Sequence, residues 1–208
     1  MQQFIAKHWF KGVAAVAIVA IAAVLVLNTS TFKKESKLPV IKKATEFSLE
    51  SSDGTKASLA DSNGKIRLVY FFWSTCPDVC QPTTYELSKV KQELEKDGMM
   101  GSKVVMYSIS FDPDKDTAQQ LASYSARFQK DTTNWKFLRG EEKAMRDLAN
   151  AYGVSVLKNK DGTFAHTNSI ALVDGQGNIR DYITSDEVGA IVSYKDIVKE
   201  VKQLNSAS

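Results

Sequence analysis

Residues 66–80 read IRLVYFFWSTCPDVC, an apolar run that leads into a turn with two cysteines. Its first eight residues are apolar except for Arg67 and rich in β-formers, as expected of a strand buried on both faces. Pro82 favours the start of a helix. Regularly spaced apolar residues after it predict that this helix continues to about Lys96. Residues 104–111 (VVMYSISF) then predict a second buried strand, so the segment forms a β-α-β unit.

The rest of the globular part supplies further helices and two hairpins. Apolar residues three and four apart predict helices at residues 117–128, 141–152 and 186–204. We expect a short strand at 135–138 and hairpins that join 45–49 to 56–59 and 169–173 to 178–183. This order predicts an α/β fold, with a thioredoxin-like mixed sheet flanked by helices.

Cys76 and Cys80 are the only two cysteines of the chain. Residues i and i+4 of a helical turn share one face, so both sulfurs can point in one direction. A strand end followed by a helix start favours thiolate, which is both the nucleophile and the metal ligand. The pair can therefore close a disulfide, serve as redox-active cysteines or bind one soft metal ion.

His166 is the only histidine of the globular part, because His8 belongs to the N-terminal tail. It lies in residues 164–169 (FAHTNS), just before an apolar strand, and we expect it at the rim of the sheet. Two thiolates and one imidazole suit copper, since Cu(I) prefers sulfur and nitrogen helps to hold Cu(II). Zinc accepts the same ligands but usually takes a fourth. A structural disulfide and a surface histidine remain the simpler alternatives at this point.

Three segments of the chain resemble motifs of the Sco/SenC family. They are residues 71–80 (FFWSTCPDVC), residues 108–117 (SISFDPDKDT), and His166-Thr167 followed by residues 172–174 (LVD) and Gly177. The motifs occur in the family order, so the resemblance covers nearly all of the globular part.

The resemblance implies a thioredoxin-like fold, a membrane tether and an extracytoplasmic domain. It implies copper, as Cu(I) or Cu(II), held by Cys76, Cys80 and His166. It also implies a role in assembling the dinuclear copper centre of cytochrome c oxidase subunit II, as copper donor, as reductant of the target cysteines, or both. The family usually has proline directly after the second cysteine, whereas Gln81 precedes Pro82 here. That departure can loosen the loop and alter copper affinity, but it removes no ligand.

Two enzymatic alternatives use the same cysteines. A thiol-disulfide reductase needs Cys76 and Cys80 but not His166, and Cys76 is the expected attacking thiol because it lies nearer the strand end. A thiol peroxidase on this fold is disfavoured, because no arginine stands beside Cys76 in the sequence.

An acidic segment of the chain resembles a calcium loop. Asp112, Asp114 and Asp116 have the spacing of the start of an EF-hand. Thr117 stands where that loop needs glycine, and Ser123 stands where it needs glutamate. We therefore exclude calcium and expect Asp112 and Asp116 to cap the next helix.

Other candidate residues carry weaker signals. Asp78, between the cysteines, is a candidate hydrogen-bond acceptor that tunes the metal ligands, and a solvated loop aspartate is the equal alternative. Met99 and Met100 are soft donors, but their place at a helix end favours core or surface packing. Phe72 and Trp73 are expected in the core.

An apolar run precedes the globular part. Residues 13–27 (VAAVAIVAIAAVLVL) carry no charge and would span roughly 22 Å as a helix, against ~30 Å of hydrocarbon. Flanking uncharged residues can extend the run, no clean cleavage site follows it, and no cysteine follows to accept a lipid. We therefore predict an anchor rather than a cleaved signal. The domain boundaries are 1–32 for the tail and anchor or signal, 33–44 for a basic stalk and 45–208 for the copper-binding domain.

The orientation of the anchor is the less direct prediction. Lysines after the run outnumber those before it, which by simple counting favours a cytoplasmic domain. A short basic N-terminal tail is instead the usual export signal. We predict a single-pass protein of the cell membrane with its domain on the extracytoplasmic side, which suits the cysteine pair.

The amino-acid composition limits the classes of partner that this protein is expected to bind. The 208 residues carry a net charge of +3, with no basic surplus that would indicate nucleic acid. The hydrophobic fraction of 43% suits one globular domain with an appendage. We expect a monomer whose partners are the membrane and a copper acceptor, subunit II or another.

Overall fold

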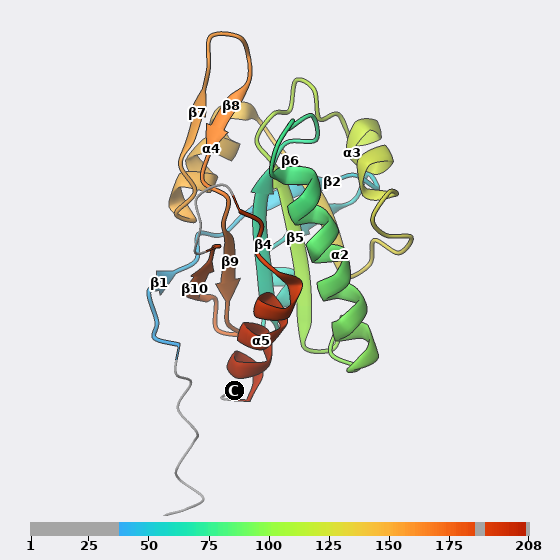
Figure 1. Cartoon of the computed structure of the whole chain (residues 1–208), viewed down its shortest axis with the longest axis vertical. Helices are drawn as coiled ribbons and strands as arrows, with labels where there is room; N and C mark the ends of the chain where they lie inside the picture. Colours follow the sequence, from blue (N-terminus) through green and yellow to red (C-terminus); the bar gives the residue numbers. More distant parts are fainter. Residues whose placement is uncertain (1–37, 186–189, 207–208) are drawn as a thin grey trace, which may run out of the picture. The chain divides into compact units, whose positions relative to one another are not determined.

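The computed structural model describes residues 38–185 and 190–206 (Figure 1). The predicted anchor, His8 and the first part of the predicted stalk lie outside these residues. Within the described ranges, no helix combines the length and the apolar character needed to cross a membrane.

An eight-stranded mixed sheet is the centre of the domain, in the order β1-β10-β9-β4-β5-β6-β2-β3 (Figure 1). Its strands are β1 (Lys42–Lys43), β2 (Ser48–Ser51), β3 (Lys56–Ser58), β4 (Ile66–Phe72), β5 (Val104–Ser110), β6 (Trp135–Arg139), β9 (Ile170–Val173) and β10 (Asn178–Ile183). The central β4, β5 and β6 are parallel, whereas β9 joins β4 antiparallel. Every residue of β4 is buried, as expected of a strand covered on both faces.

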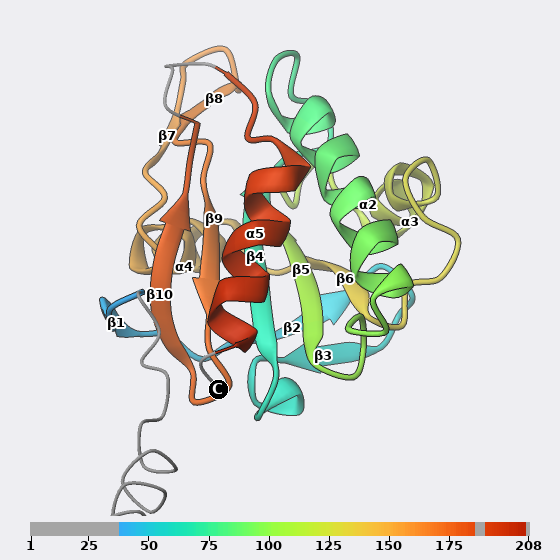
Figure 2. The ribbon, with the colours of Figure 1, turned by 60° about the horizontal axis from the view of Figure 1, so that its bottom comes forward.

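Helices cover both faces of this sheet (Figure 2). They are α2 (Cys80–Lys96), α3 (Ala118–Ser125), α4 (Glu142–Ala151) and α5 (Tyr194–Asn205), with a 3-10 turn η1 (Ala60–Ser62). α2 and α5 lie side by side over one face. Alternate residues of β4 reach the two layers, since Phe72 packs against Tyr124 of α3 and Phe71 against Tyr152 after α4.

Most predicted elements are confirmed. The β4-α2-β5 unit, the hairpin β2-β3 and the hairpin β9-β10 form where the sequence predicted them. The mixed α/β architecture is therefore the predicted one.

The closing helix is the clearest boundary error. It was expected from residue 186, but α5 begins at Tyr194 and residues 190–193 are not helical. Ser193 ends the extended segment, because its side chain accepts a hydrogen bond from the Lys195 N–H and so caps the helix.

The predicted aspartate caps of α3 are also wrong. Thr117 caps the helix by accepting the Gln120 N–H at 3.2 Å. The Asp116 carboxylate is turned inward to buried serines instead, and Asp112 lies buried at 2% exposure.

Three strands were not predicted. β1 pairs with β10, so the end of the predicted basic stalk belongs to the folded domain. β7 (Val156–Lys158) and β8 (Phe164–His166) form a separate two-stranded sheet. His166 therefore lies at the end of a small separate hairpin, which places its ring against Trp73 and Phe111 at the predicted rim of the large sheet.

Candidate metal centre

The two cysteines lie at the junction between the end of β4 and the start of α2. Cys76 sits in the turn after the strand, and its N–H bonds to the Trp73 carbonyl at 3.3 Å. Cys80 is the first residue of α2. Both thiols are free and buried, with 3% exposure for Cys76 and 0% for Cys80. The two sulfurs do converge, as the spacing predicted, but through the bend at residues 77–79 before α2 rather than through a helical turn.

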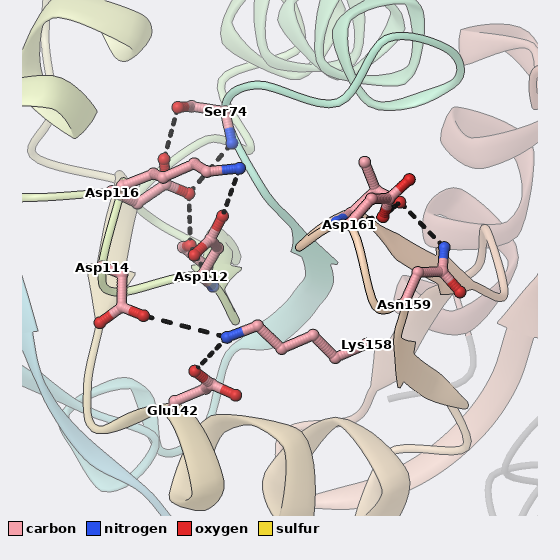
Figure 3. Close-up of polar contacts among 11 residues, drawn as sticks. Ser74, Asp112, Asp114, Asp116, Glu142, Lys158, Asn159 and Asp161 are labelled. Atoms are coloured by element: carbon pink, nitrogen blue, oxygen red, sulfur yellow. Dashed lines mark hydrogen bonds and ion pairs between the residues drawn. The ribbon is translucent and has the colours of Figure 1, made fainter.

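A buried carboxylate holds the cysteine turn in position (Figure 3). Asp116 accepts the Ser74 N–H at 3.0 Å and also the hydroxyls of Ser74 and Ser110. All three residues are buried. Ser74 precedes Cys76 by two positions, so this network ties the turn to the loop between β5 and α3.

The β7-β8 hairpin carries His166, the third residue of the site. The His166 ring packs against Trp73 and Phe111, at centroid distances of 5.1 and 5.5 Å. Phe164, two residues earlier on the same face of β8, packs on the same two rings. Trp73 and Phe111 therefore form an aromatic floor on which the hairpin rests.

One ion pair connects the hairpin to α4 (Figure 3). Lys158 of β7 bonds Glu142 at 2.7 Å, and its ammonium also lies 3.9 Å from Asp114. The same Lys158 nitrogen lies 5.5 Å from the centroid of the Phe164 ring. These contacts bring the loop after β5 beside the hairpin.

The structure brings the three predicted ligands together. Cys80 Sγ lies 3.5 Å from His166 Nε2, and the ligand atoms of all three residues lie within 4.8 Å of one another. His166 Nδ1 lies 3.1 Å from the Thr167 carbonyl, which accepts a hydrogen bond from the Nδ1–H and so leaves the Nε2 lone pair facing the sulfurs. Over the described ranges, this is the one cluster of three such residues with metal-binding spacing.

The two thiols differ in acidity. The pKa of Cys76 is lowered to about 4, chiefly by a hydrogen bond from Cys80 and further by the Asp78 N–H, although burial opposes it. The pKa of Cys80 is raised, because burial penalises its thiolate and the Cys76 thiolate lies beside it. A helix start was expected to favour thiolate, but burial outweighs that effect at Cys80.

The donor set fits a soft metal ion. Two sulfurs and one imidazole nitrogen converge in a buried place, which suits copper, and three protein ligands leave a position open to a fourth. Among the described residues, the aspartates at positions 112, 114 and 116 form no such cluster with one another.

A cavity of about 620 Å³ adjoins the ligands. Its wall includes Trp73, Cys76, His166 and the side chains after β10, but not Cys80. An incoming group therefore meets Cys76 and His166 first. None of the described residues that line it is an arginine.

The residues with weaker signals in the sequence lie on the protein surface or in the core, outside the set of three metal ligands. Asp78 lies on the cavity wall with an exposed carboxylate, so its predicted tuning role stays a prediction. Gln81 is exposed in the first turn of α2. Met99 is buried in the core and Met100 packs against it, away from the cavity wall, as expected of packing residues.

Fold and site together define a thioredoxin-like protein with a Cys-Cys-His centre. A sequence model of the SCO1/SenC family matches residues 36–202. The chain therefore belongs to the SCO1/SenC family, as its motifs predicted.

Individual relatives are distant but match over most of the domain. The SCO1 protein homolog of Bacillus subtilis is 25% identical over 177 residues, which cover 83% of this chain and 88% of that protein. The mitochondrial SCO1 homolog of Homo sapiens is 27% identical over 141 residues, which cover 65% of this chain and 46% of that protein.

Solved structures show the same fold. A SCO1/SenC family lipoprotein from Bacillus anthracis superposes with a TM-score of 0.72 at 25% identity, covering 81% of this chain and 98% of that one. The copper-bound ScoI of Bradyrhizobium japonicum gives a TM-score of 0.63 at 25% identity, covering 78% and 99%.

Proposed function

We propose that this protein is a copper chaperone that helps to assemble the dinuclear copper centre of cytochrome c oxidase. The observation that carries the proposal is the convergence of Cys76, Cys80 and His166 within 4.8 Å. Two lines of comparison support it: a related structure holds copper, and other relatives are named as SCO1 homologs.

Each ligand has a distinct part in holding the cargo. The two sulfurs hold Cu(I), and His166 Nε2 adds the nitrogen that Cu(II) needs. The Thr167 carbonyl keeps the proton on Nδ1, so Nε2 stays available to the metal.

The cavity suggests how copper leaves. Cys76 and His166 line it, whereas Cys80 lies behind them at 0% exposure. An acceptor thiolate that enters the cavity displaces these accessible ligands first, and Cys80 releases the ion last. Stepwise exchange of this kind keeps Cu(I) bound to sulfur throughout.

We also propose that the apolar run of residues 13–27 tethers the domain to the cell membrane, with the domain outside the cytoplasm. Both cysteines of this chain lie in the metal site, so no cysteine is left for a lipid anchor of the kind implied by the name of the related B. anthracis lipoprotein. An uncharged run after a basic tail is the remaining tether.

Copper titration of the purified full-length protein tests the proposed site. Wild type should bind one copper per chain. His166→Ala should weaken Cu(II) binding more than Cu(I) binding, whereas Cys76→Ser and Cys80→Ser should weaken both by more than the ~10- to 100-fold that loss of an outer hydrogen-bond partner costs. His8→Ala, which removes the other histidine, is the matched control and should bind as wild type does. Wild-type affinity in all three site variants would refute the copper site.

A thiol-disulfide reductase is the second candidate, favoured by two free thiols that lie together beside an open cavity. The Cys76 thiolate would attack a target disulfide and release one target thiolate. Cys80 would then attack the mixed disulfide, which frees the second target thiol and leaves a Cys76–Cys80 disulfide. Two electrons pass to the target, and an external thiol reductant must restore the pair.

A further inference from the structure

A hydrogen bond between Asn168 and Thr83 joins two of the segments that carry the metal ligands. Asn168 follows His166 by two residues, and Thr83 follows Cys80 by three, in the first turn of α2. The Asn168 amide nitrogen donates to the Thr83 hydroxyl at 3.1 Å, and the amide oxygen lies 3.4 Å from the same hydroxyl. The two residues are 85 positions apart in the chain, so the bond ties the histidine segment to the cysteine helix.

The Thr83 end of this bond is held in place. Thr83 is 0% exposed, and its N–H bonds the Val79 carbonyl at 3.0 Å. The next side chain, Thr84, bonds the Cys80 carbonyl at 2.7 Å. A β-branched side chain also has little freedom about its first side-chain torsion in a helix. The Thr83 hydroxyl is therefore a fixed point on the helix that begins with Cys80.

The other contacts of the histidine leave its distance to α2 less well defined. The His166 ring rests on Trp73 and Phe111, and aromatic contacts of this kind are favourable over a range of centroid distances, roughly 4.5–7 Å. The paired part of β8 ends at His166, opposite Val156. Asn168 lies beyond that end, and its hydrogen bond is directional. The bond to α2 therefore sets a distance that ring packing alone does not set.

We propose that Asn168 is a positioning residue that, through Thr83, holds His166 Nε2 within reach of Cys80 Sγ. This inference rests on the proposed copper site. The two ligand atoms lie 3.5 Å apart, which suits bonds of roughly 2.3 Å to sulfur and 2.0 Å to nitrogen at a tetrahedral angle. Sulfur holds Cu(I), whereas Cu(II) needs the nitrogen. Losing the hydrogen bond should therefore weaken Cu(II) binding and spare Cu(I) binding.

Thr83→Val in the full-length protein removes the hydroxyl and keeps the shape of the side chain. Before metal is added, the NMR signals of the His166 ring are shifted by the rings of Trp73 and Phe111. In Thr83→Val they should move toward the values of an exposed histidine, and a His8→Ala background leaves this the single histidine to observe. Titrated Cu(II) should bind ~10- to 100-fold more weakly, and Cu(I) affinity should change little. Thr83→Ser keeps the hydroxyl and should restore both readouts.

Two further variants separate positioning from stability. Asn168→Ala removes the other end of the bond at a half-buried position, and it should reproduce the effects of Thr83→Val. Ser88→Ala is the matched control, because Ser88 is a buried hydroxyl of α2 that bonds the Tyr85 carbonyl of the same helix. It should lower the free energy of unfolding but leave the His166 signals and both copper affinities as in wild type.

Three outcomes overturn the proposal. The first is a wild-type Cu(II) affinity in both Thr83→Val and Asn168→Ala, whatever the His166 signals do. The second is an equal loss of Cu(I) and Cu(II) affinity, which would mean a general loosening of the site. The third is a Thr83→Ser variant as impaired as Thr83→Val. If wild type binds no copper, the proposed function fails, and the NMR comparison still decides whether Asn168 positions His166.

Discussion

Asp116 shows how one buried residue can set the geometry of the centre. Its carboxylate accepts three hydrogen bonds, from the Ser74 backbone and from the hydroxyls of Ser74 and Ser110. The residue is 0% exposed, so water cannot take the place of its carboxylate as the acceptor for these donors. The sequence showed an aspartate before a helix and suggested a cap. That suggestion failed because the carboxylate turns inward to Ser110 and to Ser74, which lies 42 residues away in the chain, and local spacing does not reveal this contact.

Replacing Asp116 by alanine should therefore be costly. Each of the three buried donors left unpaired costs about 1–3 kcal/mol, so Asp116→Ala should lower the free energy of unfolding by at least about 3 kcal/mol. Urea unfolding of the metal-free protein measures this loss. Asp131→Ala is the matched control, because Asp131 accepts the Thr133 N–H and hydroxyl at an exposed position. A loss in Asp116→Ala no larger than in Asp131→Ala would contradict this account.

At the scale of helices and strands, the sequence predicts those elements that are long and have a regular pattern of apolar residues. β4 and β5 were predictable because each is a run of seven buried residues, and the hairpin β9-β10 because a glycine turn separates two shorter strand-like runs. β7 and β8 were not, since each has three residues and exposed Leu157 breaks the pattern. Aromatic packing of Phe164 on Trp73 holds that hairpin, and this contact joins residues far apart in the sequence.

The same limit applies to the candidate site. Cys76, Cys80 and His166 could be singled out by residue type and by the motifs around them. The hairpin that carries His166 could not, nor could the buried network at Asp116, because both depend on tertiary contacts.

The β9-β10 turn gives a prediction about pH. Asp174 is 1% exposed and accepts the N–H groups of Gln176 and Asn178, and it pairs with Arg180 at 2.9 Å. Burial opposes ionisation, but these bonds prevail and lower the pKa of Asp174 below its ordinary value of 3.8. A lowered pKa in the folded state stabilises the protein above about pH 4, and that stability is lost as the pH falls through 3.8 toward the folded-state value.

Asp174→Asn should accordingly lower the free energy of unfolding by about 1–3 kcal/mol at pH 7. The difference from wild type should shrink as the pH falls from 5 toward 2, because wild type then loses the ionised carboxylate. Denaturant unfolding at several pH values measures it. Asp147→Asn removes an exposed partner of Lys143 and should change little at any pH. A difference that stays constant down to pH 2 would show that the ionised form of Asp174 is not what stabilises the turn.

On the scale of the whole molecule, the centre is built from separate segments that the sheet brings together. The cysteine turn follows β4, the loop with Asp116 follows β5, and the histidine arrives on the β7-β8 hairpin. Parallel β4 and β5 end at the same edge of the sheet, so the first two segments meet there. The hairpin then covers that edge by resting on Trp73 and Phe111, which leaves the cavity beside Cys76 open to a partner.

Deletion of the gene separates the two candidate functions in the living cell. If the protein delivers copper, the deletion should lower cytochrome c oxidase activity, and added copper should restore it. A small-molecule thiol reductant should not, because the acceptor then lacks metal rather than electrons. His166→Ala should complement the deletion poorly when copper is scarce, whereas His8→Ala should complement it fully. Rescue by the reductant alone, together with full complementation by His166→Ala, would instead identify Cys76 and Cys80 as a reductase pair, since thiol-disulfide exchange needs both sulfurs but no imidazole.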